Sequence, residues 1–319
     1  MRTFSPLAAL LLLLALVAPA ASSPAPAVAA QERLALTNGC AATPRGIPKC
    51  GAYVGGAYRS NSPVSGWESA MGRKIGIRRT YWSPSQVSSA AEVATNDARH
   101  NRLPWLSFKA PYSWEDMAEG RGDSWARHLA TQLASVPGPV WVAVHHEPEN
   151  DGGDMLDWKA MQERLAPIMR AAAPNLGYTV ILMGYHQFHG DPEYSLARTW
   201  PQTKIDVAGF DIYEEFGTVK YGQMRTEWKE FGRRYFRPIS AWARAQGVAW
   251  GLAETGYNHT ASEVRPNWPR RTYRKLKRFG GVAFSYFNTD LNSTTSWPLS
   301  TTTKLEAFAR INRKAARLQ

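Results

Sequence analysis

Short apolar stretches alternate with polar, helix-forming stretches along most of this 319-residue chain. Continuous apolar stretches bounded by turns are typical of strands that are buried on both faces of a parallel sheet. Their starts lie about 33 residues apart, which suits one strand followed by one helix. The eight stretches begin at Ala52, Lys74, Leu103, Pro139, Tyr178, Ile205, Gly247 and Gly281.

Helical patterns with start and stop signals fill most of the intervals between these stretches. The connection from His186 to Lys204 is shorter and only weakly helical. The pattern predicts helices over residues 83–101, 123–134, 154–173, 224–245, 268–279 and 302–318.

The alternation of eight strands with helices predicts the fold class α/β, as a (β/α)8 TIM barrel that forms a single domain over residues 51–319. The alternative is a doubly wound open sheet, which would carry a glycine-rich phosphate loop after its first strand. The sequence has no G-x-G-x-x-G after that strand and no G-x-x-x-x-G-K-[ST] anywhere, so we favour the barrel.

The N-terminus has the features of a secretory signal peptide over residues 1–30. A basic start precedes an apolar run of 11 residues from Leu7 to Val17, and Ala27-Val28-Ala29 offers a cleavage site. The run is too short to span a bilayer, which takes about 20 residues. We therefore expect a secreted, extracellular protein without stable membrane association after cleavage.

Cys40 and Cys50 are the two cysteines of the chain, and both lie in the segment 31–50 that precedes the predicted barrel. In an oxidising compartment we expect them to form a disulfide that closes a small loop. The alternative is a pair of free thiols. Two cysteines are too few for a disulfide scaffold or a cysteine-rich zinc module.

Candidate catalytic residues stand where two of the predicted strands end, because active sites of such barrels lie at the carboxyl ends of the strands. The fourth stretch ends in His145-His146-Glu147 and the seventh in Glu254-Thr255-Gly256. Two facing carboxyl groups are the minimal equipment for glycoside hydrolysis. Glu149 competes with Glu147 for the role of the acid.

These motifs resemble glycoside hydrolase family 26, which holds mostly β-mannanases with some β-glucanases and xylanases. The resemblance rests on His146-Glu147, on Glu254-Thr255-Gly256 and on the Asp211-x-Tyr213 pattern after the sixth strand. It implies that Glu147 is the general acid/base and Glu254 the nucleophile. It further implies that His146 contacts the sugar and that Tyr213 donates a hydrogen bond to the nucleophile.

Further substrate contacts are expected from Asp211, Arg79, Trp82, Tyr286 and Trp297 at the strand ends and beyond. Arg79 either braces the nucleophile or pairs with a barrel carboxylate, and each tryptophan is either a platform for a sugar ring or a packing residue.

The chain departs from the family pattern in two places. Pro148-Glu149-Asn150-Asp151 follows the His-Glu pair where the family has Met-Asn-Gly or a similar motif. The eighth strand ends in Tyr286-Phe287-Asn288, where the family's clan often has tryptophan. Both departures concern the substrate rather than the reaction.

We therefore expect a secreted, monomeric, retaining glycoside hydrolase that cleaves a β-linked polysaccharide, with β-1,4-mannan favoured. The alternatives are a β-glucanase or xylanase of the same clan, or a non-catalytic carbohydrate-binding barrel. We expect no cofactor, and no metal either, because His-His-Glu-Pro-Glu-Asn lacks the spacing of a zinc site.

The net charge of +12 changes this picture little. The basic run from Arg270 to Arg278 is expected to be the solvated face of a helix, with Tyr273 and Leu276 facing inward. A nucleic-acid partner would be accompanied by recognition motifs, which are absent from the sequence. A basic surface would still favour adhesion to anionic cell walls.

Overall fold

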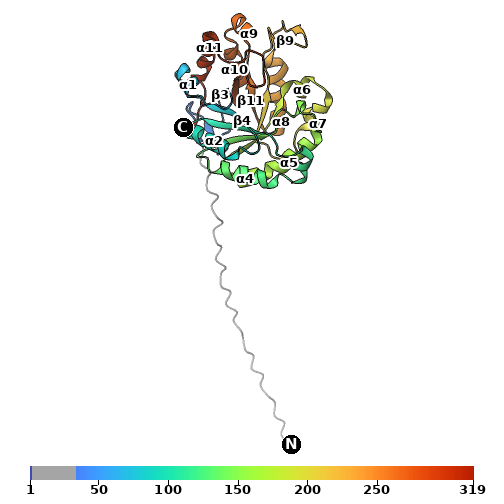
Figure 1. The fold of residues 1–319 in the computed structure, drawn as a ribbon. Helices are drawn as coiled ribbons and strands as arrows, with labels where there is room; N and C mark the ends of the chain where they lie inside the picture. Colours follow the sequence, from blue (N-terminus) through green and yellow to red (C-terminus); the bar gives the residue numbers. More distant parts are fainter. Residues whose placement is uncertain (2–33) are drawn as a thin grey trace. The chain divides into compact units, whose positions relative to one another are not determined.

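The computed structural model describes residue 1 and residues 34–319, and its centre is a closed barrel of eight parallel strands (Figure 1). The predicted signal peptide lies outside the described residues apart from Met1. Every strand pairs with its successor in the chain order, and the last pairs with the first. The strands are β3 (Tyr53–Tyr58), β4 (Ile77–Trp82), β5 (Leu103–Phe108), β6 (Val140–Val144), β7 (Leu176–Met183), β8 (Val207–Asp211), β11 (Ala249–Thr255) and β12 (Ala283–Asn288).

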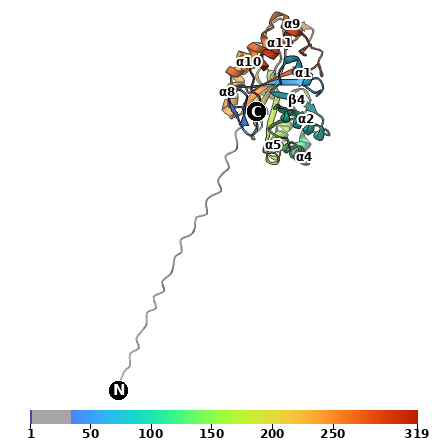
Figure 2. The same cartoon turned by 90° about the vertical axis from the view of Figure 1, so that its left-hand side faces the viewer.

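Helices surround the barrel on its outside, as Figures 1 and 2 show from two directions. The predicted (β/α)8 fold is therefore confirmed. Among the described residues, no helix is long and apolar enough to cross a membrane. The helices are α1 (Ser65–Met71), α2 (Val87–Arg99), α3 (Trp114–Glu119), α4 (Asp123–Ala134), α5 (Met155–Ala172), α6 (Gly184–His189), α7 (Leu196–Thr199), α8 (Arg237–Gln246), α9 (His259–Val264), α10 (Trp268–Arg278) and α11 (Thr302–Asn312).

The prediction of one helix over residues 224–245 is wrong in its first part. A small hairpin of β9 (Val219–Lys220) and β10 (Gln223–Met224) occupies its start, and a single π-helical stretch (Phe231–Phe236) leads into α8. The buried Glu214 carboxylate accepts the backbone N–H groups of Phe216 and Lys229, so a side chain satisfies donors in this irregular segment.

The helix predicted over residues 302–318 ends at Asn312. After that point the chain returns to the amino-terminal end of the barrel, where the N–H of Ala316 donates to the carbonyl of Ala52. Leu318 forms a bridge with Leu36 beside it. Burial of these residues against the barrel outweighs continued helix formation.

Residues 34–50 cover the amino-terminal end of the barrel. They contain the short antiparallel pair β1 (Leu34–Ala35) and β2 (Ala41–Ala42), and Leu36 and Ala42 are buried in the core inside the barrel. The Cys40–Cys50 disulfide predicted from the sequence is present, with a Cα–Cα distance of 5.7 Å. The core above this segment includes Trp105 and Trp141, whose rings meet edge to face with centroids 5.1 Å apart.

Successive side chains on each strand point to opposite sides of the barrel wall, and this alternation positions the site. On β4, Ile77 belongs to the inner core, and Arg79 points the same way to donate to Ser107 Oγ on β5. Arg78 points outward and pairs with Asp97 on α2 at 3.2 Å.

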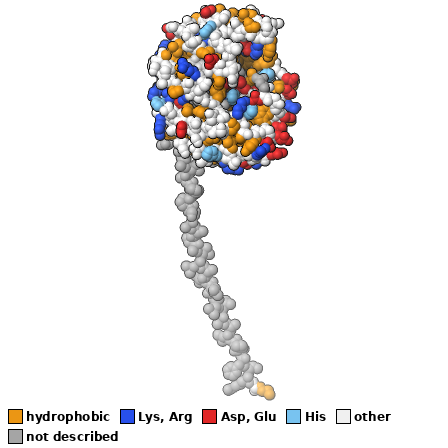
Figure 3. All heavy atoms as spheres, in the orientation of Figure 1, with side chains coloured by type: hydrophobic (Ala, Val, Ile, Leu, Met, Phe, Trp, Pro, Cys, Tyr) orange, Lys and Arg blue, Asp and Glu red, His pale blue; other side chains and the backbone are white. Residues whose placement is uncertain are grey.

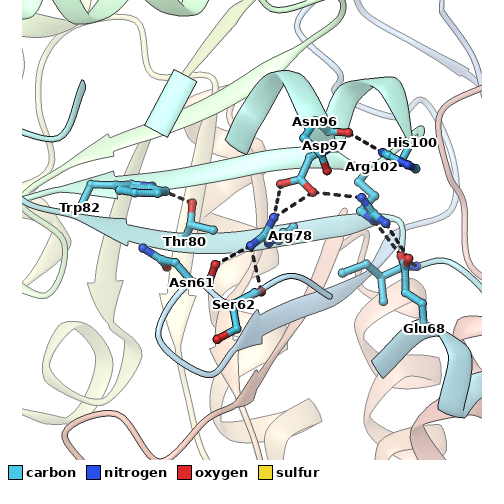
Figure 4. Close-up of polar contacts among 11 residues, drawn as sticks. Asn61, Ser62, Glu68, Arg78, Thr80, Trp82, Asn96, Asp97, His100 and Arg102 are labelled. Carbon is cyan, nitrogen blue, oxygen red and sulfur yellow. Dashed lines mark hydrogen bonds and ion pairs between the residues drawn. The ribbon is translucent and has the colours of Figure 1, made fainter. Parts of the chain in front are cut away.

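Arg78 and Asp97 are part of a buried network of four charged side chains outside the barrel (Figure 4). Arg102 pairs with Asp97 at 3.2 Å and with Glu68 on α1 at 2.5 Å. Burial raises the pKa of Asp97, and the two arginines act against that shift. The network fixes α1 and α2 to the strand layer, because a buried charge that loses its partner destabilises the fold strongly.

Candidate active site

A cleft with a cavity volume of about 610 Å³ lies at the carboxyl ends of the barrel strands. It holds both predicted catalytic residues, Glu147 after β6 and Glu254 at the end of β11. Its lining consists of Tyr81, Trp82, Ser83, Ser107, Lys109, His146, Glu147, Asp151, Tyr213, Glu254, Phe287, Leu291, Asn292, Ser293 and Trp297.

Glu254 is buried and held on both carboxylate oxygens. The Tyr81 hydroxyl donates to Oε1 at 2.7 Å, and the Tyr213 hydroxyl donates to Oε2 at 2.6 Å. The Arg79 guanidinium lies 3.7 Å from Oε1. Burial, with the Glu254 charge as the second cause, raises the pKa of each tyrosine well above its usual range, so both remain donors. This arrangement fixes the orientation of the Glu254 carboxyl group.

A bulge in β11 turns Glu254 into the cleft. Pairing with β8 steps from Leu252 opposite Phe210 to Glu254 opposite Asp211, which leaves Ala253 as an extra residue. Leu252 packs in the outer core and Ala253 in the inner core. Strict alternation would therefore direct Glu254 outward, and the bulge re-aims it.

Glu147 occupies a strained turn that follows β6 directly. His145 and Glu147 both have left-handed backbones, with φ of 55° and 50°, and the two flank His146. Such conformations cost non-glycine residues about 1–2 kcal/mol each and gather at functional sites. Two backbone hydrogen bonds hold the turn. The N–H of His145 donates to the Phe108 carbonyl, and the N–H of Glu147 donates to the Ile181 carbonyl.

Burial, together with the nearby Glu254 charge, raises the pKa of Glu147 to about 8. Asp211 places a carboxylate oxygen within 4.8 Å of Glu147, and burial, followed by the Glu254 and Glu147 charges, raises the pKa of Asp211 well above its usual range. With its pKa at about 8, Glu147 keeps its proton at neutral pH. Glu147 thus differs from Glu254, which has three donors or cations around it.

Glu147, Asp211 and Glu254 each place a carboxylate oxygen within 4.8 Å of the other two. Within the described part of the chain this trio is the group whose spacing would suit a cation. Tyr81 and Tyr213 already occupy one lone pair on each oxygen of Glu254. The same spacing brings Glu147, whose pKa is raised to about 8, close to the Glu254 carboxylate that the two tyrosines hold.

The two histidines before Glu147 have different surroundings. His146 lines the cleft beside the Tyr81 ring, at a centroid distance of 5.6 Å. Burial, then the Arg79 charge, lowers the pKa of His146 well below its usual range, so it is neutral. His145 instead hydrogen bonds to Asp151 Oδ2 at 2.6 Å, and Lys109 pairs with the same oxygen at 2.5 Å.

Of the aromatic residues predicted to contact the substrate, only some lie in the cleft. Trp82 and Trp297 line the cleft, and the Trp297 ring lies 4.8 Å from that of Tyr213. The expectation for Tyr286 is wrong, because β12 directs it outward against Phe308 of α11. Its hydroxyl donates to the Trp297 carbonyl at 2.9 Å, and the next residue, Phe287, faces the cleft.

The Trp297 segment is also held from below by a buried lysine. Lys304 Nζ donates to the carbonyls of Ser296 at 2.7 Å and Trp297 at 2.9 Å. Burial lowers the pKa of Lys304 to about 7. Lys304 and Tyr286 therefore position a cleft residue without entering the cleft.

Glu149, the competing candidate for the acid, lies outside the cleft. Its Oε1 accepts the N–H of Met183 at 3.0 Å and an N–H of Gln187 at 2.5 Å. Burial raises its pKa to about 7. Glu149 therefore connects the end of β7 to α6 through these hydrogen bonds.

The structure adds Tyr81, Ser107, Lys109 and Phe287 to the predicted site residues. Alternation along β4 indicates Tyr81, because it lies two positions after the inward-facing Arg79. The same rule separates Phe287 from Tyr286. Nothing in the local sequence distinguishes Lys109, which reaches the cleft only because β5 ends at Phe108.

Comparisons with known proteins show the fold. No model of a known protein family matches the chain, and a search of the curated proteins found no match. Solved structures do match, among them a family 26 β-mannanase from Bacteroides ovatus, with a TM-score of 0.60, 14% identity and coverage of 83% of this chain and 89% of that one.

Two further matches are bacterial mannan-degrading enzymes. An endo-β-1,4-mannanase from Cellulomonas fimi has a TM-score of 0.58 and 13% identity, covering 82% of this chain and 70% of that one. An exo-β-1,4-mannosidase from an Opitutaceae bacterium has a TM-score of 0.61 and 13% identity, covering 85% of this chain and 60% of that one. The chain thus has a (β/α)8 barrel like that of the family 26 β-mannanases.

Proposed function

We propose that this protein is a secreted, retaining glycoside hydrolase that cleaves β-1,4-mannan within the chain. The observation that carries the proposal is the contrast between two carboxyl groups with nearby oxygens: burial raises the pKa of Glu147 to about 8, whereas Glu254 accepts a tyrosine hydrogen bond on each oxygen. Retaining glycosidases place their carboxyl groups about 5–5.5 Å apart, whereas inverting ones need about 6.5–9.5 Å. The spacing within 4.8 Å between oxygens favours retention.

In the first step a lone pair on a Glu254 oxygen attacks the anomeric carbon while the bond from that carbon to the glycosidic oxygen breaks. Glu147 gives its proton to the departing oxygen, so the leaving sugar departs as a neutral alcohol. The hydroxyls of Tyr81 and Tyr213 keep the Glu254 carboxylate oriented for attack. Glu254 becomes a neutral ester, and Glu147 becomes a carboxylate.

In the second step the Glu147 carboxylate takes a proton from a water molecule, and the water oxygen attacks the anomeric carbon. The ester bond to Glu254 breaks, and the Glu254 carboxylate re-forms. Two inversions at one carbon leave the β-configuration unchanged. Loss of the Glu254 charge in the intermediate removes one cause of the raised Glu147 pKa, which suits its change from acid to base.

Mannan is the favoured substrate because the solved structures that share the fold include several enzymes that act on it. A cavity of about 610 Å³ falls in the size range of ligands larger than a single sugar ring, which fits a polymer segment. Trp82, Trp297 and Phe287 offer apolar ring faces in the cleft, and His146 offers a neutral imidazole for a sugar hydroxyl.

Secretion is supported by the leader-like residues 1–30 and by the Cys40–Cys50 disulfide, which oxidising compartments favour. The proposed reaction requires no cofactor, and we propose that the protein acts as a monomer on its polysaccharide.

Reducing-sugar release tests the proposal. The purified protein and its Glu147→Gln variant are incubated with mannan, glucomannan, mixed-linkage β-glucan, carboxymethylcellulose and xylan. We expect release from mannan by the unchanged protein and loss of release in the variant. Release from another polymer alone would assign the substrate to that polymer. Retardation in affinity gels without release from any polymer would identify a binding protein.

A further inference from the structure

A second cavity, of about 410 Å³, lies between α10 and α11 on the outside of the barrel. The two helices lie side by side in both views (Figures 1 and 2). We call this cavity the basic groove. Its lining consists of the cations Arg270, Arg274, Lys277, Arg310, Arg313 and Lys314, together with Tyr273 and Ile311.

The lining is charged at its rim and apolar at its floor. All six cationic side chains are exposed, whereas Tyr273 and Ile311 are buried. The inward placement of Tyr273 and Leu276 agrees with the amphipathic pattern of the helix. The groove is therefore a built depression between two packed helices and not a single flat helix face.

Almost nothing acidic offsets these charges. Among the described residues, Arg310 pairs with Glu306 at 3.1 Å, and that pair is exposed on both sides. The other five cations have no carboxylate within 4.0 Å in the described part of the chain. A cleft lined by charge of one sign concentrates the field and attracts ligands of the opposite sign. Figure 3 shows acidic side chains gathered along one edge of the face drawn, so charge is unevenly distributed over that face.

We propose that the basic groove binds an anionic polysaccharide, a thin flexible polymer with a carboxylate or phosphodiester on each repeating unit. Such a chain can enter a depression between two helices and present charges to both walls. The binding site is separate from the cleft, because the two cavities share no lining residue. Binding there would hold the protein at an anionic surface while the cleft stays open.

The shape and chemistry of the groove disfavour other polyanions. Single-stranded nucleic acid is usually held by exposed aromatic rings, and Tyr273 in the groove is buried with its hydroxyl on the Ala52 carbonyl. Membrane-surface helices add exposed apolar side chains to their cations, and Ile311 at this floor is buried.

The test compares two variants of the full chain that each lose four positive charges. The groove variant carries Arg270→Gln, Arg274→Gln, Arg313→Gln and Lys314→Gln. The matched control carries Lys49→Gln, Arg99→Gln, Arg198→Gln and Lys204→Gln, four exposed cations outside the groove. Circular dichroism and thermal unfolding establish that both variants are folded.

Binding is measured by fluorescence anisotropy with labelled polygalacturonate, labelled poly(mannosyl phosphate), whose sugars are joined by phosphodiesters, and a labelled DNA duplex, each over a series of salt concentrations. We expect the groove variant to bind the two anionic glycan probes about tenfold more weakly, with a shallower salt dependence, because fewer counterions are displaced. The control variant should stay within about twofold of the unchanged protein, since dispersed charges act only through screened long-range fields.

The two glycan probes distinguish carboxylate from phosphodiester as the preferred charge. Equal loss of affinity in both variants would overturn the proposal, because net charge alone would then explain binding. Tighter binding of the DNA duplex than of either glycan at the same salt concentration would overturn the assigned partner. None of these outcomes depends on hydrolysis in the cleft.

Discussion

The Tyr81 hydroxyl donates a 2.7 Å hydrogen bond to Glu254 Oε1, across the barrel mouth from its own strand β4 to β11. Tyr213 holds the other oxygen of the same carboxylate. Glu254 is therefore oriented by two phenols, one on β4 and one on the segment that follows β8, with Arg79 nearby. A carboxylate held this way offers its attacking lone pair in one direction without having to reorganise during the reaction.

Tyr81→Phe should lower kcat about tenfold to a hundredfold, with a smaller change in KM, because it removes one hydrogen bond to a charged group. Steady-state kinetics on the best polymer of the panel measures both constants. Tyr58→Phe is the matched control, since Tyr58 stacks on Trp67 outside the cleft. Equal effects of the two substitutions would contradict the role assigned to Tyr81.

The acid role of Glu147 predicts a basic limb in the pH profile of kcat/KM. Glu147 must carry its proton to start the reaction, and its pKa is raised to about 8. Activity should therefore be retained through neutral pH and fall about tenfold per pH unit above that value. A limb that begins near pH 4.5, the ordinary value for glutamate, would contradict the raised pKa of Glu147. An aryl substrate with an activated leaving group should lose this limb in Glu147→Gln.

The alternation of inward and outward side chains explains which parts of this site follow from the sequence. The eight apolar stretches became eight strands because each is buried on both sides. Once the strands are known, the alternation of side chains directs Arg79, Asp211 and Tyr213 toward the inside of the barrel. The same rule excludes Tyr286 from the cleft and places Tyr81 in it. Both conclusions require the strand directions that the structure supplies.

Other features depend on contacts between distant segments. The inward direction of Glu254 requires the bulge at Ala253, and no local signal marks that extra residue. The raised pKa of Glu147 depends on Glu254, which is 107 positions away in the chain and joins it only on barrel closure. The helix boundaries near residues 224–236 depend on the buried Glu214 carboxylate, which a helical pattern does not reveal.

Glu149→Gln should change how stability depends on pH. The folded-state pKa of Glu149 is about 7, above its ordinary value of 4.5. The folded protein thus holds this proton more tightly, and the associated stability is complete below pH 4.5 and lost as pH rises through 7. Urea unfolding at pH 5 and pH 8 should show the unchanged protein losing up to about 3 kcal/mol relative to Glu149→Gln.

Glu193→Gln, at an exposed position, serves as the control for this comparison. The pKa shifts of other groups, including Glu147, are common to all three proteins. Their contributions to the pH dependence of the unfolding free energy therefore largely cancel in the comparison. The same pH dependence in Glu149→Gln and in the unchanged protein would contradict the account of Glu149.

Asp97→Asn should destabilise the fold by about 3–5 kcal/mol, the usual cost of removing one partner from a buried ion pair. The substitution leaves the Arg78 guanidinium buried without a carboxylate, while Arg102 keeps Glu68. Urea unfolding at pH 7 measures the loss. Glu306→Gln removes an exposed pair with Arg310 and should change stability little. Similar losses in both variants would contradict the importance of burial in the network.

Azide rescue of Glu254→Ala tests the central claim most directly. The variant is incubated with an aryl β-mannoside, with and without sodium azide, and the product is examined by nuclear magnetic resonance. We expect no turnover without azide and, with azide, a glycosyl azide of inverted configuration, because the small anion attacks from the side that Glu254 occupied. Full activity of Glu254→Ala without azide would contradict the assignment of the nucleophile and the proposed mechanism built on it.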